Sequence, residues 1–218
     1  MFITLEGPEG SGKSTQIKRL AERLQALGYP VITTREPGGT PIGDQIRQVL
    51  VRMENQELHP RTEILLFLAA RAQLVEQVVK PALRDGKIIL CDRYGDSTLA
   101  YQGYGHGLDL EKLRQMLAFA TDQLKPDLTI LLDLDVRTGL LRKKAEDEWN
   151  RLDAYEVLFH ERVREGYLKL AREEPERWRI VDAAQGIDTV QEDLFQLVLG
   201  AIENRYGTTD LQKGQMKG

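Results

Sequence analysis

Short apolar runs alternate along the chain with segments in which apolar residues recur every three or four positions. The runs are typical of buried strands, and the recurring spacing is typical of amphipathic helices. This pattern predicts strands at 2–5, 31–34, 87–91, 128–134 and 178–181. It predicts helices at 17–27, at 42–50, at 64–75 with an end near Pro81, at 110–120, along a charged stretch from 136 to 173, and at 190–201.

The alternation of strands and helices predicts an α/β fold of three layers, in which helices flank a five-stranded parallel sheet. No repeat or linker divides the chain, so residues 1–206 are expected to form one domain, and the polar segment 207–218 a disordered tail. Ligands of such sheets bind beyond the carboxyl ends of the strands. The residues at 6–7, 35–39, 92–94 and 135–136, which follow four predicted strands, should therefore converge on one site.

A glycine-rich segment at 7–14, the phosphate loop, joins the first predicted strand to the first predicted helix. It reads Gly-Pro-Glu-Gly-Ser-Gly-Lys-Ser and matches the pattern G-x-x-x-x-G-K-[ST] of nucleoside triphosphate-binding proteins. Backbone N–H groups and the helix start would bind the phosphates, Lys13 would bridge the terminal ones, and Ser14 would ligate Mg²⁺. The alternative is a glycine-rich turn without a ligand. The motif predicts a P-loop NTPase-like fold and these triphosphate contacts: Gly7, Pro8, Glu9, Gly10, Ser11, Gly12, Lys13, Ser14 and Thr15.

Charged residues at two further strand ends point to a second anionic ligand. Asp92 ends an apolar strand and is predicted to hold Mg²⁺ or its water shell, although a strand-end aspartate can also cap a turn. Arg35 and Arg93 leave strand ends at the same edge of the sheet, where guanidinium groups suit bidentate phosphate contacts. A phosphate site beside a triphosphate predicts a phosphate acceptor. The alternative for either arginine is a structural ion pair, for example with Glu36.

Phe67 and Arg71 lie four positions apart on a predicted helix and so share one face. A phenylalanine beside a guanidinium could stack on a base and bond its edge. The spacing equally fits a core phenylalanine and an arginine that extends along the surface to solvent.

The charged stretch at 142–151 is typical of a solvated helix face. The variable positions of the phosphate loop carry no cation, yet phosphoryl transfer needs one, and the site must exclude water. We therefore expect a basic lid at about 142–153 that closes over the phosphates, with Arg142 and Arg151 as candidate catalytic cations.

Composition narrows the possible partners. The net charge of −4 and the pI of about 5.6 favour neither nucleic acid nor an anionic membrane as a partner. No apolar run is long enough to span a bilayer, and the chain begins directly with a strand, so no signal peptide and a cytoplasmic location are expected. Cys91 is expected to be a buried thiol. The three histidines lack metal spacing, and an anionic acceptor needs no general base.

The chain resembles the thymidylate kinase family through motifs that run in order along nearly its whole length. They are Phe-Ile-Thr-Leu-Glu-Gly-Pro-Glu-Gly-Ser-Gly-Lys-Ser-Thr at 2–15, Thr-Arg-Glu-Pro-Gly-Gly-Thr at 34–40, Leu-Phe-Leu-Ala-Ala-Arg at 66–71, Asp-Arg-Tyr at 92–94, Ser-Thr-Leu-Ala-Tyr-Gln-Gly at 97–103, Lys-Pro-Asp-Leu-Thr at 125–129 and Asn-Arg-Leu-Asp at 150–153. The resemblance implies transfer of the γ-phosphate of ATP to dTMP with Mg²⁺, giving dTDP for dTTP synthesis. It also implies a homodimer.

The resemblance assigns roles to individual positions. Phe67 would stack on thymine and Arg71 would bond its edge, Thr98 and Gln102 would line the same pocket, and Tyr101 would disfavour a 2′-hydroxyl. Three arginines, Arg35, Arg47 and Arg93, would surround the acceptor phosphate, and Glu9 would reach the 3′-hydroxyl or the metal.

The lid resembles the bacterial type, in which basic residues of the lid supply the catalytic cation. Lys143 and Lys144 stand beside Arg142 where some relatives have further arginines, and lysine cannot make the bidentate contact. Arg142 and Arg151 are therefore favoured. The adenine is expected near Arg142 and the loop at 183–185.

Two rival functions remain at this point. One is a related kinase with another nucleoside or nucleotide acceptor. The other is a nucleotide-dependent switch without an acceptor, although the Asn-Lys-x-Asp segment of guanine-reading switches does not occur in the sequence.

Overall fold

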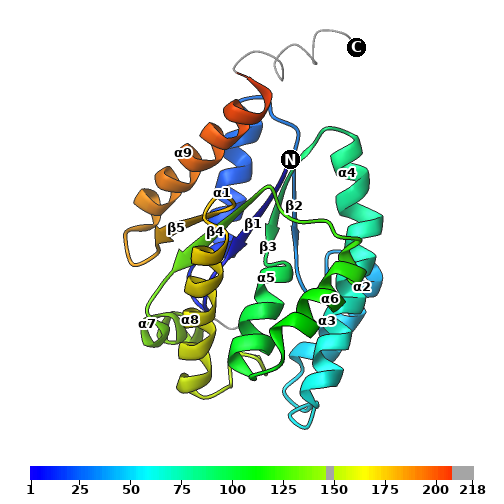
Figure 1. Cartoon of the computed structure of the whole chain (residues 1–218). Helices are drawn as coiled ribbons and strands as arrows, with labels where there is room; N and C mark the ends of the chain where they lie inside the picture. The colour runs from blue at the N-terminus through cyan, green and yellow to red at the C-terminus, as the bar shows by residue number, and fades with distance from the viewer. Residues whose placement is uncertain (146–149, 208–218) are drawn as a thin grey trace.

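A computed structural model of the chain describes residues 1–145 and 150–207. Five strands, β1 (Phe2–Glu6), β2 (Val31–Arg35), β3 (Ile88–Asp92), β4 (Leu128–Asp133) and β5 (Trp178–Asp182), form one sheet in the order β2-β3-β1-β4-β5. Every neighbouring pair is parallel. The predicted α/β fold with a five-stranded parallel sheet is confirmed (Figure 1). The predicted tail at 207–218, apart from residue 207, and the centre of the predicted lid, at 146–149, lie outside the described residues.

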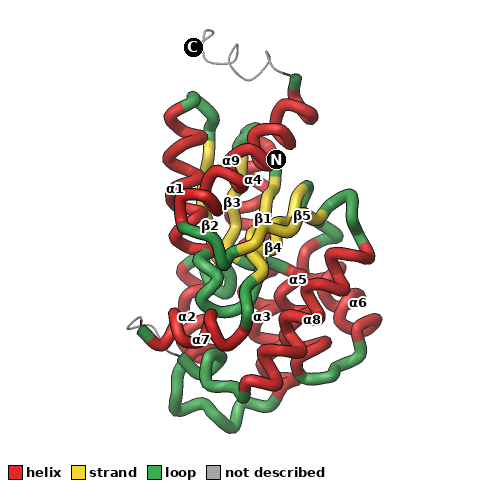
Figure 2. The backbone as a smooth tube through the Cα atoms, turned by 90° about the vertical axis from the view of Figure 1, so that its left-hand side faces the viewer, coloured by secondary structure: helices red, strands yellow, loops and turns green. Residues whose placement is uncertain are grey.

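The helices cover both faces of the sheet (Figure 2). One face packs against α1 (Lys13–Ala26) and α9 (Ile187–Tyr206), whose apolar residues join the central strands in one core. The other face carries α3 (Pro60–Leu74), α6 (Leu110–Thr121) and α8 (Val157–Glu173). The remaining helices are α2 (Pro41–Val51), α4 (Lys80–Arg84), α5 (Gly95–Thr98) and α7 (Val136–Lys144), with π-helical turns η1 (Val75–Val79) and η2 (Leu99–Gly105).

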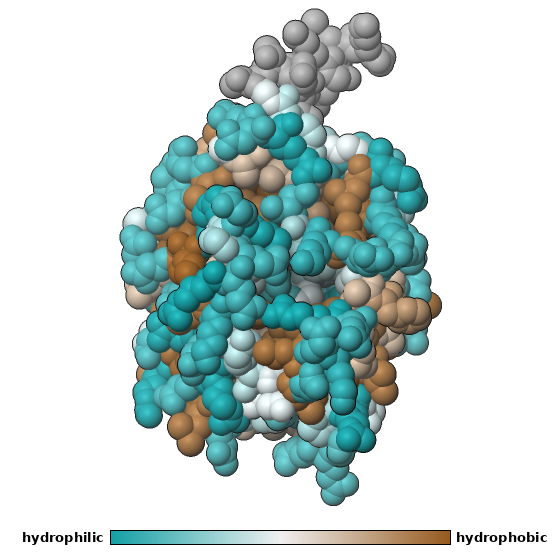
Figure 3. All heavy atoms as spheres, viewed as in Figure 1, coloured by the Kyte–Doolittle hydropathy of each residue, from teal (hydrophilic) through white to brown (hydrophobic). Residues whose placement is uncertain are grey.

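The strand sequences follow their position in the sheet. All residues of β1 are buried, as are nearly all of β3 and β4, because these inner strands have a helical layer on each face. In the edge strand β2 only Val31 is buried, and the following residues alternate between half-buried and exposed. No helix within the described residues is both long and apolar enough to cross a membrane. The face in Figure 3 is mostly hydrophilic, with its hydrophobic residues in separate patches.

Two predicted helix boundaries are wrong. The helix expected to end near Pro81 continues through η1 into α4, with Pro81 in the first turn of α4. Proline lacks a backbone N–H and crowds the preceding turn, and the wider π-helical turn accommodates both effects. The charged stretch at 136–173 is not one helical stretch, because α7 ends at Lys144 and α8 begins at Val157.

The helical segment at 95–105 was not predicted. Its glycines weaken a helical pattern, but they allow close packing of η2 against α8. A Cβ on Gly105 would lie 2.6 Å from the Phe159 ring, and one on Gly166 of α8 would lie 2.5 Å from the Tyr104 ring. Tertiary packing therefore explains glycines that local propensity treats as helix breakers.

Candidate active site

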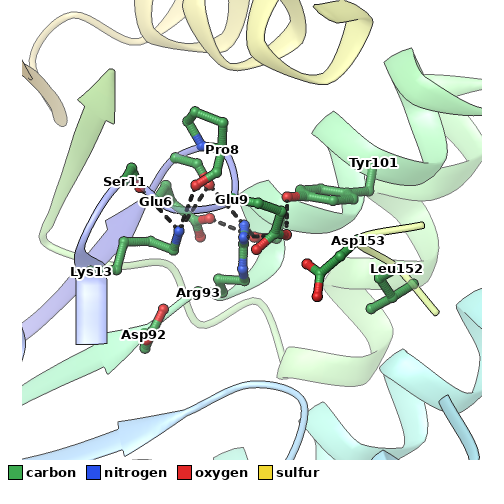
Figure 4. Close-up of polar contacts among 12 residues, drawn as sticks. Glu6, Pro8, Glu9, Ser11, Lys13, Asp92, Arg93, Tyr101, Leu152 and Asp153 are labelled. Atoms are coloured by element: carbon green, nitrogen blue, oxygen red, sulfur yellow. Dashed lines mark hydrogen bonds and ion pairs between the residues drawn. The ribbon is translucent and has the colours of Figure 1, made fainter. Parts of the chain in front are cut away.

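The phosphate loop connects β1 to α1 and is shaped by glycines. Gly7, Gly10 and Gly12 all have positive φ, which residues with a Cβ rarely adopt. The Lys13 ammonium donates to the carbonyls of Gly7 (3.2 Å) and Pro8 (2.9 Å) and to the side chain of Ser11 (3.1 Å) (Figure 4). The loop therefore holds the Lys13 ammonium against its own carbonyl groups, at the place where a triphosphate would bind.

Helix α7, which leads into the predicted lid, lies against the phosphate loop. A Cβ on Gly10 would lie 2.0 Å from the Gly139 carbonyl oxygen, and one on Gly139 would lie 2.2 Å from the Glu9 carbonyl oxygen. Only glycine permits this approach of α7 to the loop. The segment just before the predicted lid thus lies beside the predicted triphosphate site.

A cavity of about 640 Å³ opens at the carboxyl ends of β1, β2 and β3. The segments that follow β1, β2 and β3 converge there with α3. Residues 135–136 after β4, which were predicted to join them, are not among the lining residues. The cavity is lined by most of the predicted site residues: Glu9, Gly10, Gly12, Lys13, Ser14, Thr15, Arg35, Arg47, Phe67, Arg71, Asp92, Arg93, Thr98, Tyr101 and Gln102.

Ser14 and Asp92 are in direct contact. The Ser14 hydroxyl donates to Asp92 Oδ2 at 2.5 Å. Their oxygens are ligands that suit Mg²⁺, which binds proteins through few carboxylates and completes its shell with phosphate oxygens and water. The described residues contain no group of three acidic, histidine or cysteine side chains that could hold a metal alone. The pair therefore fits a metal shared with a nucleotide.

Arg93 follows β3 with a φ of 69°, an uncommon value for a residue other than glycine. Its Nη2 donates to Glu9 Oε1 at 2.7 Å, and its Nη1 donates to the Gly7 carbonyl at 3.0 Å. The Tyr101 hydroxyl donates to the same Glu9 oxygen at 2.6 Å. Arg93 is thus held between the phosphate loop and η2, inside the cavity.

Neighbouring charges set the ionisation of the phosphate loop. Burial would raise the pKa of Glu9, but the charges of Arg93 and Lys13 outweigh it and hold that pKa at about 2. Burial, together with repulsion from Arg93, lowers the pKa of Lys13 to about 8, and the charge of Glu9 opposes the shift. At neutral pH all three side chains are charged.

Glu6, at the end of β1, was expected at the site only by its position after a strand, and the sequence assigned it no role. It is fully buried and accepts hydrogen bonds from Tyr94 N (2.7 Å), Ser97 Oγ (2.6 Å) and Tyr167 OH (2.9 Å). Burial and repulsion from Asp96 raise the pKa of Glu6 to about 7. The Tyr167 hydroxyl also accepts a hydrogen bond from Arg93 Nη1 at 3.0 Å, so Glu6 helps to orient Arg93 through Tyr167.

Arg71 is buried, with 1% of its side chain exposed, so the alternative in which it extends to solvent is wrong. Its Nε donates to Glu36 Oε2 at 2.6 Å, and its Nη1 donates to Thr98 Oγ1 at 2.8 Å. Glu36 therefore pairs with Arg71 and not with Arg35 or Arg93. Both of those arginines have other carboxylate partners, as the alternative of a structural ion pair allows: Arg93 Nη2 lies 2.7 Å from Glu9 Oε1, and Arg35 Nη2 lies 3.8 Å from Asp44 Oδ1.

The candidate lid cations occupy different places. Lys143 lines the cavity together with Asn150 and Leu152. Arg142 Nη1 donates to the Ala183 carbonyl at 3.1 Å, which places it beside the loop where the adenine is expected. Arg151 is buried outside the cavity lining, where its Nε donates to Leu50 O at 2.8 Å and its Nη2 to Glu63.

Asp153 and His160 are buried beside Glu9 (Figure 4 shows Asp153) and were not predicted as site residues. Burial and the charge of Glu9 raise the pKa of Asp153 to about 6, and burial lowers the pKa of His160. No sequence spacing connects them with the phosphate loop, because the fold alone brings α8 to that side.

Comparison with known proteins gives one consistent family. The family model described as thymidylate kinase matches residues 5–194. A thymidylate kinase of Roseiflexus castenholzii is 52% identical over 211 residues, covering 91% of this chain and 92% of the relative. One of Deinococcus radiodurans is 50% identical over 198 residues, covering 91% and 96%. The crystal structure of thymidylate kinase from Ehrlichia chaffeensis matches with a TM-score of 0.74 at 34% identity, covering 91% of this chain and 98% of that one.

Proposed function

The chain belongs to the thymidylate kinase family, and we propose that the cavity described above carries out its reaction: transfer of the γ-phosphate of ATP to dTMP. The product, dTDP, is an intermediate of dTTP synthesis. The observation that supports this site most is one cavity lined by both the phosphate loop and Arg93. A triphosphate and a monophosphate bound there would meet end to end.

The phosphate loop binds ATP. The phosphates are bound by backbone N–H groups of the segment 7–15, other than Pro8, which has none, and Lys13 exchanges its loop carbonyl partners for the terminal phosphates. Arg142 and the loop at 183–185 border the adenine. The Ser14 hydroxyl and the Asp92 carboxylate are the protein groups that fit Mg²⁺. When bound, Mg²⁺ neutralises charge on the β- and γ-phosphates.

The acceptor occupies the other half of the cavity. Phe67 stacks on thymine, Arg71 bonds its edge, and Thr98 and Gln102 line the same pocket. Tyr101 packs against the sugar, where Glu9 can accept from the 3′-hydroxyl. The acceptor phosphate binds Arg93, with Arg35 and Arg47 at the rim, because guanidinium groups suit two-point contacts with phosphate.

The transfer itself needs positioning and charge stabilisation. An oxygen of the dTMP phosphate attacks the γ-phosphorus while the bond from that phosphorus to the β–γ bridging oxygen breaks, and ADP leaves. The attacking oxygen is already anionic, so no base must remove a proton. Lys13 and Arg93 stabilise the charge that develops between the two ligands. Lys143 is the lid cation placed to join them, since it lines the cavity.

We also propose a cytoplasmic homodimer. The neighbouring helices α3 and α6 expose two large apolar side chains, Leu65 at 58% and Phe119 at 91%. Exposed apolar residues on adjacent helices favour contact with a second copy. Sedimentation of the wild type and of Phe119→Asp tests this, with a dimer expected only for the former.

A coupled assay of ADP release with dTMP, dUMP, dCMP and thymidine tests the function. We expect dTMP to be the best acceptor, and thymidine, which lacks the phosphate that Arg93 binds, to be a poor one. Preference for thymidine would overturn the acceptor assignment. ADP release that is independent of any acceptor would favour a nucleotide-hydrolysing switch instead.

A further inference from the structure

Glu63 lies on α3 one turn before Phe67 and two turns before Arg71, so the three residues share one face of the helix. It is buried, with 1% of its surface exposed. A carboxylate is rarely buried to this degree unless it is paired. Its position beside two proposed thymine-binding residues raises the question of what it does for them.

The Glu63 carboxylate accepts hydrogen bonds on both oxygens. Oε1 accepts from Gln102 Nε2 at 2.8 Å, and Oε2 accepts from Arg151 Nη2 and from the Tyr155 hydroxyl at 3.1 Å. Burial would raise the pKa of Glu63. The His106 ring, whose Nε2 lies 3.6 Å from Glu63 Oε1, together with the hydrogen bonds from Arg151 and Gln102, outweighs burial and holds that pKa at about 2. Glu63 is therefore ionised and can only accept hydrogen bonds.

An acceptor-only partner fixes the orientation of the Gln102 amide. Gln102 must direct its NH₂ group to Glu63, so its carbonyl oxygen remains for another donor. Gln102 lines the cavity, and none of the described residues donates a hydrogen bond to its Oε1. Arg71, on the same wall, supplies N–H donors. The base edge thus faces a guanidinium donor and an amide acceptor.

This arrangement fits one kind of pyrimidine. Thymine and uracil carry an acceptor oxygen at C4 and a donor N–H at ring position 3, whereas cytosine carries a donor amino group at C4 and an acceptor at N3. Relying on the proposed function, we propose that Glu63 is a positioning residue that selects bases with an N3–H by fixing the orientation of the Gln102 amide. Glu63 does not touch the base and acts through Gln102.

Arg151 completes the arrangement by neutralising Glu63. Arg151 also bonds the end of α2, through its Nε to Leu50 O at 2.8 Å and through its backbone N–H to Val51 O at 3.2 Å. Arg151, a residue of the predicted lid, therefore compensates the charge of Glu63 in the protein interior. If Glu63 served packing alone, its substitution would change the affinities for all acceptors equally. If it positions Gln102, its substitution changes the affinity for dTMP relative to that for dCMP.

The test is Glu63→Gln, with dissociation constants measured for dTMP, dUMP and dCMP. A glutamine at 63 can donate as well as accept, so the Gln102 amide is free to turn. We expect the preference for dTMP over dCMP to fall about tenfold, the size of one neutral hydrogen bond. The preference for dTMP over dUMP should stay unchanged, because both bases carry the N3–H. Glu165→Gln, an exposed carboxylate on α8 that pairs with Lys169, is the control and should alter neither ratio.

Glu63→Gln leaves Arg151 buried without its charge partner and could prevent folding. A second variant keeps the proposal testable in that case. Glu63→Gln combined with Arg151→Gln removes both charges and should show the same tenfold change in selectivity. An unchanged ratio of dTMP to dCMP in the folded variants would overturn the positioning role. A wild type that binds dTMP no better than dCMP and releases no ADP with it would instead overturn the proposed function.

Discussion

Arg93 Nη2 lies 2.7 Å from Glu9 Oε1, so the guanidinium proposed to bind the acceptor phosphate is already oriented by a carboxylate of the phosphate loop. Both side chains are about 15% exposed, 15% for Arg93 and 16% for Glu9, so the pair is only slightly screened by solvent. The pair joins the two halves of the cavity. Disturbing Arg93 should therefore affect phosphoryl transfer more than the fold.

Arg93→Lys should lower kcat by about 100-fold or more. Lysine keeps the charge but cannot make the two-point contact with phosphate, and loss of one preorganised donor costs about that factor. Steady-state kinetics with dTMP measure the effect. The control is Arg23→Lys on α1, where Arg23 pairs with Glu192 of α9 and does not line the cavity, and its kcat should be unchanged. A kcat within threefold of wild type for Arg93→Lys would contradict the assignment.

Phe67→Ala should weaken dTMP binding by about 1–3 kcal/mol, because stacking of a base on an aromatic ring contributes about that much. The affinity for ATP should change little, since Phe67 lies on α3 and not at the phosphate loop. Calorimetric titration of each ligand gives both values. Leu158→Ala, at an exposed position of α8, is the control. Equal losses for dTMP and ATP would count against the proposed pocket.

ATP affinity should fall as the pH rises above about 8. Burial and Arg93 hold the pKa of Lys13 at about 8, below its usual 10.5, so the ammonium that binds the phosphates loses its proton from that pH upward. ATP stabilises the charged form, and its own phosphates are fully ionised above neutral pH. We expect about tenfold weaker binding at pH 9 than at pH 7, because each pH unit beyond the pKa costs up to a factor of ten. An affinity that stays constant over this range would mean that Lys13 keeps its proton.

The two lid variants Arg151→Ala and Lys143→Ala should separate stability from turnover. Arg151→Ala leaves Glu63 buried without its charge partner and should lower the free energy of unfolding by about 3–5 kcal/mol. The loss should diminish as the pH falls from 4.5 toward 2, because the low pKa of Glu63 stabilises the fold only while the carboxylate is ionised. Lys143→Ala should lower kcat at least tenfold with little change in stability. Denaturant unfolding and kinetics of both variants measure this, and the opposite pattern would restore Arg151 as the catalytic cation.

Local patterns in the sequence predicted the parts of the site that depend on local structure. The phosphate loop must connect a strand to a helix, and parallel strands must end at one edge of the sheet, so Lys13, Asp92 and Arg93 could be placed together from the chain alone. The spacing of Phe67 and Arg71 predicted a shared face.

Long-range pairing could not be predicted in the same way. Glu63 meets Gln102 and Arg151 across separations of 39 and 88 positions, and no periodicity encodes such contacts. The helical segment at 95–105 was missed because its glycines are required by packing against α8 rather than by local geometry. The sequence could not decide whether Arg71 binds a base or extends to solvent, because only the fold brings its buried partner Glu36 to it.

The most direct test of the account is a crystal structure with dTMP and a non-hydrolysable ATP analogue bound together. We predict an oxygen of the dTMP phosphate within about 3.5 Å of the γ-phosphorus. Lys13 should contact the triphosphate and Arg93 the monophosphate. A complex in which dTMP binds outside the cavity, with Arg93 turned away from both phosphates, would contradict the account.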